Sequence, residues 1–164
     1  MDETPAQTVG PFLHLALADP ALRGALGSDD DDDLVTVHGN VLDGQGAPVP
    51  DALVETWSYG GPFVRCATDP DGRWEVRTRR PPAVATLDGT AQAPHLAVSV
   101  FARGLLDRVV TRLYFEGDAA NAADPTLRAV GSRAATLLAH PDRPSSYRFD
   151  IRLQGADETV FFAV

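Results

Sequence analysis

The stretch YRFDIRLQ, residues 147–154, decides the fold class of this chain. Its apolar residues, Tyr147, Phe149, Ile151 and Leu153, alternate with polar ones. A period of two places one face of a β-strand against a core and the other face in water. We therefore predict a strand over residues 147–154.

Short apolar segments of the same kind precede this strand. The 164 residues include 13 prolines and 14 glycines spread along the chain, which suits strands and turns better than long helices. Further strands are expected over residues 34–43, 52–57, 72–79, 96–102, 108–116, 134–139 and 158–164. Their spacing favours an all-β fold of the β-sandwich type over a parallel α/β sheet.

Helices are expected to be few and short. Residues 20–26 and 118–123 are the two candidates, and the second should end before Pro125, because the residue preceding proline is pushed out of the α region. Residues 77–93 are expected to form a long loop. The length allows one compact domain, which we divide into an N-terminal arm with an acidic loop, residues 1–33, and a sandwich, residues 34–164.

The charge balance argues against several classes of partner. With 14 Lys and Arg against 23 Asp and Glu, the net charge of −9 would repel nucleic acid and anionic membranes. We expect no secretory leader and no membrane span, because the N-terminus is acidic and long apolar windows are absent. The lone Cys66 permits no internal disulfide, which fits a reducing, cytoplasmic setting.

The five aspartates at 29–33 invite two interpretations. Calcium prefers several carboxylate ligands, but a calcium loop usually spaces them and includes a glycine. Consecutive aspartates repel one another and point in different directions, so a solvated acidic loop is the favoured interpretation.

Common catalytic motifs are absent from the sequence. There is no G-x-S-x-G nucleophile elbow and no G-x-x-x-x-G-K phosphate loop. The four histidines, His14, His38, His95 and His140, form no H-x-H or H-x-x-x-H pair, so a metal site would have to assemble from distant segments. We expect His38 on an exposed strand face and His140 in a polar loop.

The N-terminal stretch TPAQTVGPF, residues 4–12, is unusual for a free tail. Its two X-Pro steps exclude a helix interior, and the apolar residues 12–17 that follow could hold the stretch against another surface. Together with GNVLDGQGAPV (39–49), APH (93–95), TRLYF (111–115) and YRFDIR (147–152), it resembles the intradiol ring-cleavage dioxygenases. The resemblance runs in order over nearly the whole chain and implies a transthyretin-like β-sandwich.

In members of this family with two related subunits, the resemblance implies that one subunit holds Fe(III) through two tyrosines and an H-x-H pair of histidines. Here His95 occupies the first histidine position and Ala97 replaces the second. Tyr59 is the one tyrosine in the loop after Trp57, and none lies between residues 78 and 94. The resemblance therefore implies that this chain binds no iron and that a related β subunit, its partner in a hetero-oligomer, carries the Fe(III).

The resemblance leaves this chain the task of completing a substrate pocket. Arg103 would lie near the substrate carboxylate, the alternatives being an ion pair with Asp107 or a salt bridge at a subunit interface. The remaining pocket wall would be Thr8, Gly10, Pro11 and Phe12. No residue of this chain is expected to be catalytic.

The reaction implied for the assembled enzyme is the cleavage of protocatechuate by O2 to 3-carboxy-cis,cis-muconate, in the β-ketoadipate pathway of aromatic catabolism. Two alternatives are a stand-alone transthyretin-like binding or scaffolding domain and a self-sufficient intradiol enzyme with an altered metal site. The apolar residues 160–164 favour a subunit interface, with a terminal strand covered by the chain's own loops as the alternative.

Overall fold

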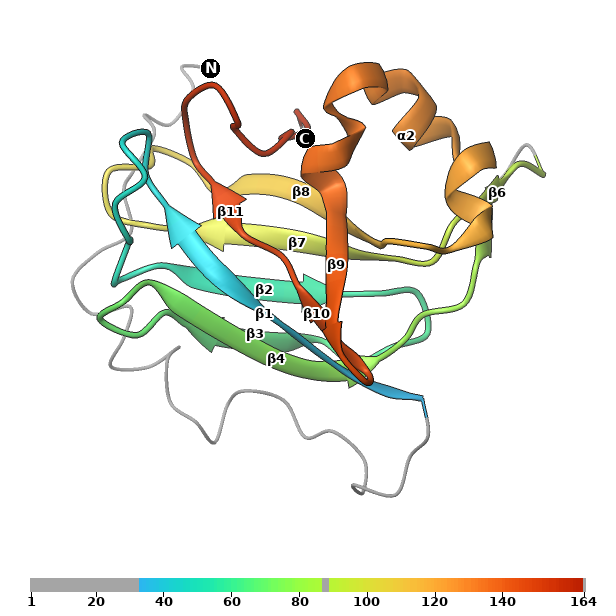
Figure 1. Cartoon of the computed structure of the whole chain (residues 1–164), viewed down its shortest axis with the longest axis horizontal. Coiled ribbons are helices and arrows are strands. Elements are labelled where there is room, and N and C mark those ends of the chain that lie inside the picture. The colour runs from blue at the N-terminus through green and yellow to red at the C-terminus, as the bar shows by residue number, and fades with distance from the viewer. Residues whose placement is uncertain (1–32, 87–88, 164) are drawn as a thin grey trace, which may run out of the picture.

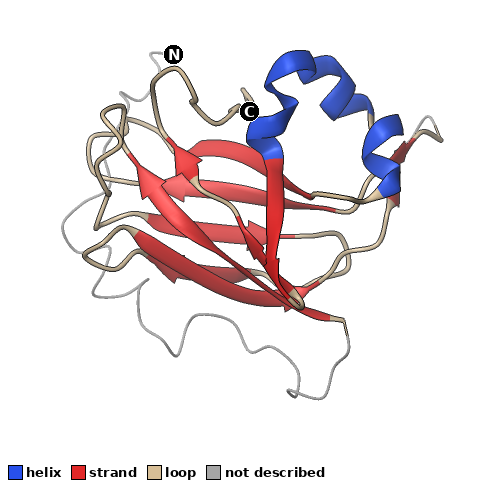
Figure 2. Ribbon diagram, in the orientation of Figure 1, coloured by secondary structure: helices blue, strands red, loops and turns tan. Residues whose placement is uncertain are grey.

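The computed structural model describes residues 33–86 and 89–163. In chain order its elements are β1 (Leu34–Leu42), β2 (Leu53–Trp57), β3 (Val64–Ala67), β4 (Arg73–Arg79), β5 (Val84–Ala85), β6 (Ala91–Gln92), β7 (His95–Phe101), β8 (Val109–Phe115), the 3-10 helix η2 (Ala119–Ala123), α2 (Pro125–Val130), the 3-10 helix η3 (Gly131–Leu137), β9 (Leu138–Arg143), β10 (Ser146–Arg148) and β11 (Ile151–Arg152). Strands dominate the described residues, and the short helices gather at one end beside β6 (Figure 2). The all-β class is thus confirmed, as is a short helix within residues 118–123, whereas the expected helix over residues 20–26 lies outside the described residues.

One curled sheet of nine strands forms the body of the molecule (Figure 1). Its order is β11-β1-β10-β9-β8-β7-β2-β3, and β4 pairs with the other edge of β1. The sheet nearly closes: its two edge strands, β3 and β4, are joined by a turn in which the Asp69 amide donates to the Arg73 carbonyl at 2.9 Å. The strands β5 and β6 form a separate small hairpin.

Alternating side chains fill the inside of this curled sheet. In β4, Trp74, Val76 and Thr78 point inward and are buried, while the arginines and the glutamate between them are exposed. The main core also contains fully buried residues of β1, β2 and β7. A second, smaller cluster of Ala93, Tyr114, Leu127 and Leu137 lies between β8 and the helical segment.

The alternation predicted for residues 147–154 is confirmed, but the strand is broken into β10 and β11. Both pieces run parallel to the same edge of β1. Between them the Phe149 amide donates to the His38 carbonyl at 2.7 Å, and the Asp150 carboxylate accepts from the Asn40 amide. A Cβ on Gly39 would lie 1.9 Å from the Phe149 carbonyl oxygen, so the close approach at the break requires glycine.

Most predicted strands are confirmed within a residue or two, and two are wrong. Residues 131–137 form η3, and β9 begins only at Leu138. Residues 158–163 form no strand, and their one ladder contact is the isolated bridge between Val110 and Phe162. Partial burial, this one bridge and hydrogen bonds between Val160 and the side chains of Thr111 and Thr136 hold the segment. An apolar composition does not distinguish such packing from strand pairing.

The sequence reasoning also missed three elements: β3, the β5–β6 hairpin within the expected loop 77–93, and α2. The Asp124-Pro125 step does end η2, as expected, but it also begins α2. Asp124 is the N-cap and Pro125 takes the first helical turn, where its missing amide hydrogen costs nothing.

The C-terminal segment packs against the chain itself. Phe161 contacts the main core, whereas Val160 and Phe162 contact the second cluster, and all three are half-buried. Within the single chain the segment is thus partly covered, and the subunit interface and the covering by the chain's own loops both stay predictions.

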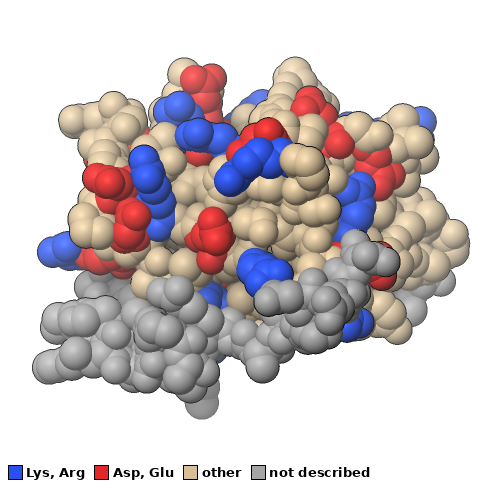
Figure 3. Space-filling view, turned by 60° about the horizontal axis from the view of Figure 1, so that its bottom comes forward, with Lys and Arg blue, Asp and Glu red and all other residues tan. Residues whose placement is uncertain are grey.

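Acidic and basic side chains are interspersed on the face shown in Figure 3 rather than gathered by sign. Within residues 33–86 and 89–163, no helix has both the length and the apolar character needed to cross a bilayer.

Candidate functional site

The outer face of β7 carries His95 and Ala97, the two residues that the sequence resemblance equates with a pair of histidines. Leu96, Val98 and Val100 of β7 point into the core, so His95 and Ala97 point outward, away from it. In the antiparallel ladder, His95 lies opposite Tyr114 and Ala97 lies opposite Arg112. The His95 and Tyr114 rings are 5.2 Å apart between centroids.

A buried carboxylate organises this face. Asp124 is fully buried, and its Oδ1 accepts from the amides of Thr126 and Leu127, each at 2.9 Å. The Tyr114 hydroxyl donates to the same oxygen at 3.2 Å, while Oδ2 accepts from the Ala93 amide at 2.9 Å. Asp124 therefore joins the start of β7, the end of β8 and the N-terminus of α2.

Arg112 completes the arrangement. Its Nη1 donates to the Tyr114 hydroxyl at 3.2 Å and to the Thr126 hydroxyl at 3.1 Å. We refer to His95, Arg112, Tyr114, Asp124 and Thr126 as the Asp124 cluster. Two sequence signals could have revealed it. One is the Asp124-Pro125 step, which is typical of a helix N-cap, and the other is the i, i+2 spacing that places Arg112 and Tyr114 on the same face of β8.

Burial shifts the pKa values of the two rings in opposite directions. It lowers the pKa of His95, and the nearby charge of Arg112 lowers that pKa further, against the opposing effect of a hydrogen bond to the Ala93 carbonyl. His95 Nδ1 donates that bond at 2.8 Å, so a neutral ring carries its proton on Nδ1. Burial also raises the pKa of Tyr114, which matches the hydroxyl's role as a donor to Asp124.

These residues do not fit a ferric centre. Ala97 offers a methyl group where a second imidazole is needed, and the Tyr114 oxygen is already bonded to Arg112 and Asp124. Tyr59 is largely exposed in the turn after β2, and the Tyr147 hydroxyl accepts from Arg80 at 2.6 Å. In the described part of the chain, no group of three or more His, Cys, Asp or Glu side chains could hold a metal ion.

The structure places Arg103 in the turn after β7, at the opposite end of that strand from His95. Its side chain is 76% exposed, and its Nε donates to Asp51. Arg103 thus pairs with Asp51 and not with Asp107, which the sequence suggested as an alternative partner. Arg103 is therefore outside the Asp124 cluster, with most of its side chain exposed to solvent.

The other predicted pocket residues, Thr8, Gly10, Pro11 and Phe12, lie outside the described residues, as does most of the aspartate run. Of the remaining histidines, His38 is half-buried on β1 and its Nε2 lies 2.9 Å from Asp142. His140 is exposed as expected, but it lies on β9 and pairs with Glu116.

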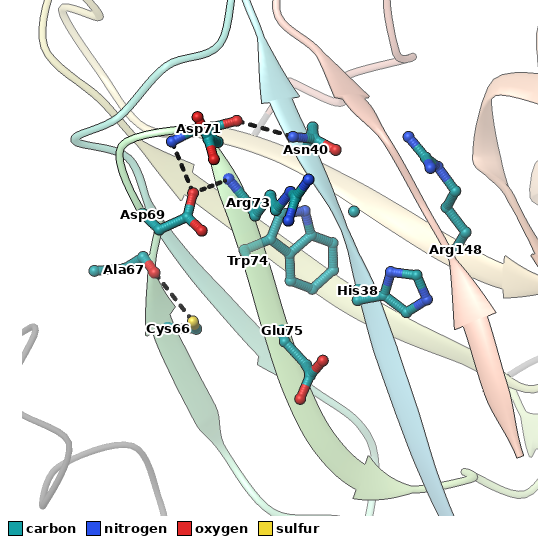
Figure 4. Close-up of a pocket in the computed structure, with 11 residues that line it drawn as sticks. His38, Asn40, Cys66, Ala67, Asp69, Asp71, Arg73, Trp74, Glu75 and Arg148 are labelled. Carbon is teal, nitrogen blue, oxygen red and sulfur yellow. Dashed lines mark hydrogen bonds between the residues drawn. The ribbon is translucent and has the colours of Figure 1, made fainter.

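A polar pocket of about 920 Å³ lies beside β1 and the β3–β4 turn (Figure 4). Two of the polar side chains that line it, Asp69 and Asn40, are engaged in the local fold. Asp69 accepts from the amides of Asp71 and Arg73, and Asn40 donates to the Asp71 carbonyl. These hydrogen bonds show that Asp69 and Asn40 stabilise the β3–β4 turn.

Comparisons with known proteins agree with the sequence motifs. A family model described as Dioxygenase matches residues 11–155. The protocatechuate 3,4-dioxygenase alpha chain of Burkholderia cepacia is 37% identical, over 100% of this chain and 98% of the relative. The beta chain from the same organism is 29% identical, over 94% of this chain and 77% of the relative.

Among solved structures, the mercury-inhibited catechol 1,2-dioxygenase from Acinetobacter sp. ADP1 superposes with a TM-score of 0.60 at 20% identity. The match covers 77% of this chain and 54% of that enzyme, so this chain spans about half of its length. This likeness concerns the fold.

Proposed function

This chain belongs to the intradiol dioxygenase family, and from that premise we propose that it acts as the α subunit of an enzyme that cleaves protocatechuate with O2 to 3-carboxy-cis,cis-muconate. The observation that carries the proposal is the match to an alpha chain over the full length of both proteins. A stand-alone binding domain would have no need for that full-length agreement.

The metal in this proposal belongs to a β subunit. The chain is also related to a beta chain, which supports a complex built from two homologous subunits. The Asp124 cluster lacks the second histidine and holds its tyrosine in hydrogen bonds, so its residues offer no ferric site. The Fe(III) of the complex would act as Lewis acid and template for the catechol within the partner.

The contribution of this chain would be to orient the substrate. Arg103 is exposed, so its guanidinium can turn from Asp51 towards a carboxylate at an interface, where its planar fork suits bidentate pairing. The N-terminal wall of the pocket would consist of Thr8, Gly10, Pro11 and Phe12. Holding the ring in one orientation beside the metal lowers the barrier without a catalytic group from this chain.

Two finer assignments belong to the same proposal. The curled sheet is best described as a transthyretin-like sandwich, with β4 and β1 on one layer and β2, β7 and β8 on the other, because their inward side chains meet in one core. A cytoplasmic location fits the single buried thiol of Cys66.

Reconstitution tests the proposed function. The chain should co-purify with a co-expressed β chain of this family, and the complex should consume O2 with protocatechuate. Each chain alone should be inactive or far less active. Failure of the two chains to associate, or oxygen uptake that is the same with and without this chain, would overturn the proposal.

A further inference from the structure

The Asp124 cluster contains a cation where the family resemblance would place part of a metal site. Ala97 stands at the second histidine position, and its cross-strand neighbour is Arg112. Side chains directly opposite each other in an antiparallel pair have Cβ atoms about 4.5–5.5 Å apart. A methyl group at residue 97 is smaller than an imidazole, so it occupies less of the face next to Arg112 than a second histidine would.

The guanidinium is held in that region by groups that also contact the buried carboxylate. Arg112 Nη1 donates to the hydroxyls of Tyr114 and Thr126 at 3.2 and 3.1 Å. The Tyr114 hydroxyl and the Thr126 amide in turn donate to Asp124 Oδ1. One hydroxyl thus bridges the cation and the carboxylate directly, and a second residue links them through its side chain and backbone.

A fully buried carboxylate needs compensation, because an uncompensated buried charge is strongly unfavourable. In proteins this compensation comes from hydrogen bonds, a paired cation or a bound metal. Asp124 has the hydrogen bonds, and among the residues the structure describes Arg112 supplies the positive charge that bridges to it through Tyr114. The charge of Arg112 also acts on His95 and Tyr114.

We propose that the Arg112 guanidinium is a built-in replacement for a metal ion: it balances Asp124, holds the Asp124 cluster together and keeps divalent and trivalent cations out. The inference rests on family membership and on this geometry, not on the identity of the substrate. It predicts that restoring the second histidine alone will not restore metal binding. The resident positive charge must be removed as well.

The test uses the full chain and Co²⁺, whose visible spectrum reports ligation by imidazole. Four variants are compared with the unaltered chain: Ala97→His, Arg112→Gln, Ala97→His with Arg112→Gln, and Ala97→His with Arg128→Gln. Arg128 is the matched control, because it is an exposed arginine on the neighbouring α2. The combined Ala97→His and Arg112→Gln variant should bind one Co²⁺ at least roughly 100-fold more tightly than Ala97→His alone or the Arg128→Gln control, because removal of a nearby unit charge is worth that much. Arg112→Gln alone should bind weakly, because it lacks the second imidazole.

Two binding results would overturn the proposal. One is Co²⁺ binding by Ala97→His alone that equals binding by the combined Arg112→Gln variant. The other is a folded variant with Ala97→His and Arg112→Gln that binds Co²⁺ no more tightly than the control with Ala97→His and Arg128→Gln.

A stability comparison tests the same idea without metal. Glutamine keeps a donor at residue 112 but removes the charge, whereas lysine keeps the charge and loses the planar fork. The urea midpoint of Arg112→Lys should exceed that of Arg112→Gln, and a glutamine variant that unfolds while the lysine variant folds gives the same answer. A glutamine variant at least as stable as the lysine variant would show that Arg112 is only a hydrogen-bond donor.

Discussion

Replacing Asp124 tests whether one buried carboxylate connects three parts of the fold. Asp124→Ala removes the N-cap of α2, formed with the Thr126 and Leu127 amides, at a cost of about 1 kcal/mol. It also leaves the buried Ala93 amide without its acceptor, which costs about 1–3 kcal/mol. The Tyr114 hydroxyl loses its acceptor as well, so we expect the free energy of unfolding to fall by roughly 2–4 kcal/mol or more.

The assay is urea unfolding of the full chain followed by tryptophan fluorescence, since Trp74 is buried in the core. Asp69→Ala is the matched control, because Asp69 also accepts from two backbone amides but is exposed, so water can replace it. The loss in the free energy of unfolding for Asp124→Asn should lie between the losses for Asp124→Ala and Asp69→Ala, because asparagine keeps the cap but presents an NH2 group to one donor. Equal losses for Asp124→Ala and Asp69→Ala would refute the reasoning.

Four further predictions concern pH, packing, substrate binding and the N-terminal arm. Because burial lowers the pKa of His95, the unfolded chain binds more protons than the folded one below about pH 6.5, so the free energy of unfolding should decrease on acidification from that pH. His95→Gln should weaken this pH dependence in urea titrations. An unchanged pH profile in the variant would exclude the effect. Gly39→Ala places a Cβ against the Phe149 carbonyl and should cost roughly 2 kcal/mol, lowering Tm by about 4–8 °C; an unaltered Tm would mean that the break between β10 and β11 relaxes freely. In the complex, Arg103→Ala should raise KM for protocatechuate more than for catechol, and deletion of residues 1–11 should reduce turnover without unfolding the chain. Equal KM changes, or full activity after the deletion, would contradict those two roles.

The strand pattern was predictable because the inside of a curled sheet imposes a period of two. Short apolar segments between turn residues placed β1, β4, β7 and β8 correctly, and the period of two gave the buried side of residues 147–154. It did not reveal the break at Phe149, because that break depends on the approach of Gly39 from a strand over 100 residues earlier. Pairing between distant segments leaves little trace in either segment alone.

The residues of the Asp124 cluster, too, could be predicted from the sequence only where they are local features of one strand. Motif comparison identified His95 and the substitution by Ala97, since both are local features of one strand. It did not identify Arg112 or Asp124, whose roles arise only when β8 and the α2 cap meet beside β7. An Asp-Pro step predicts a helix cap, but the residues that will share the capping carboxylate depend on the packed fold.

Metal analysis of this chain tests the central claim most directly. The chain should be purified after expression alone in iron-supplemented medium and, separately, from its complex with the β chain after the two are dissociated. We predict that iron remains with the β chain and that this chain contains none in stoichiometric amount and shows no tyrosinate-to-iron absorption. One iron per copy of this chain, with that absorption, would contradict the account.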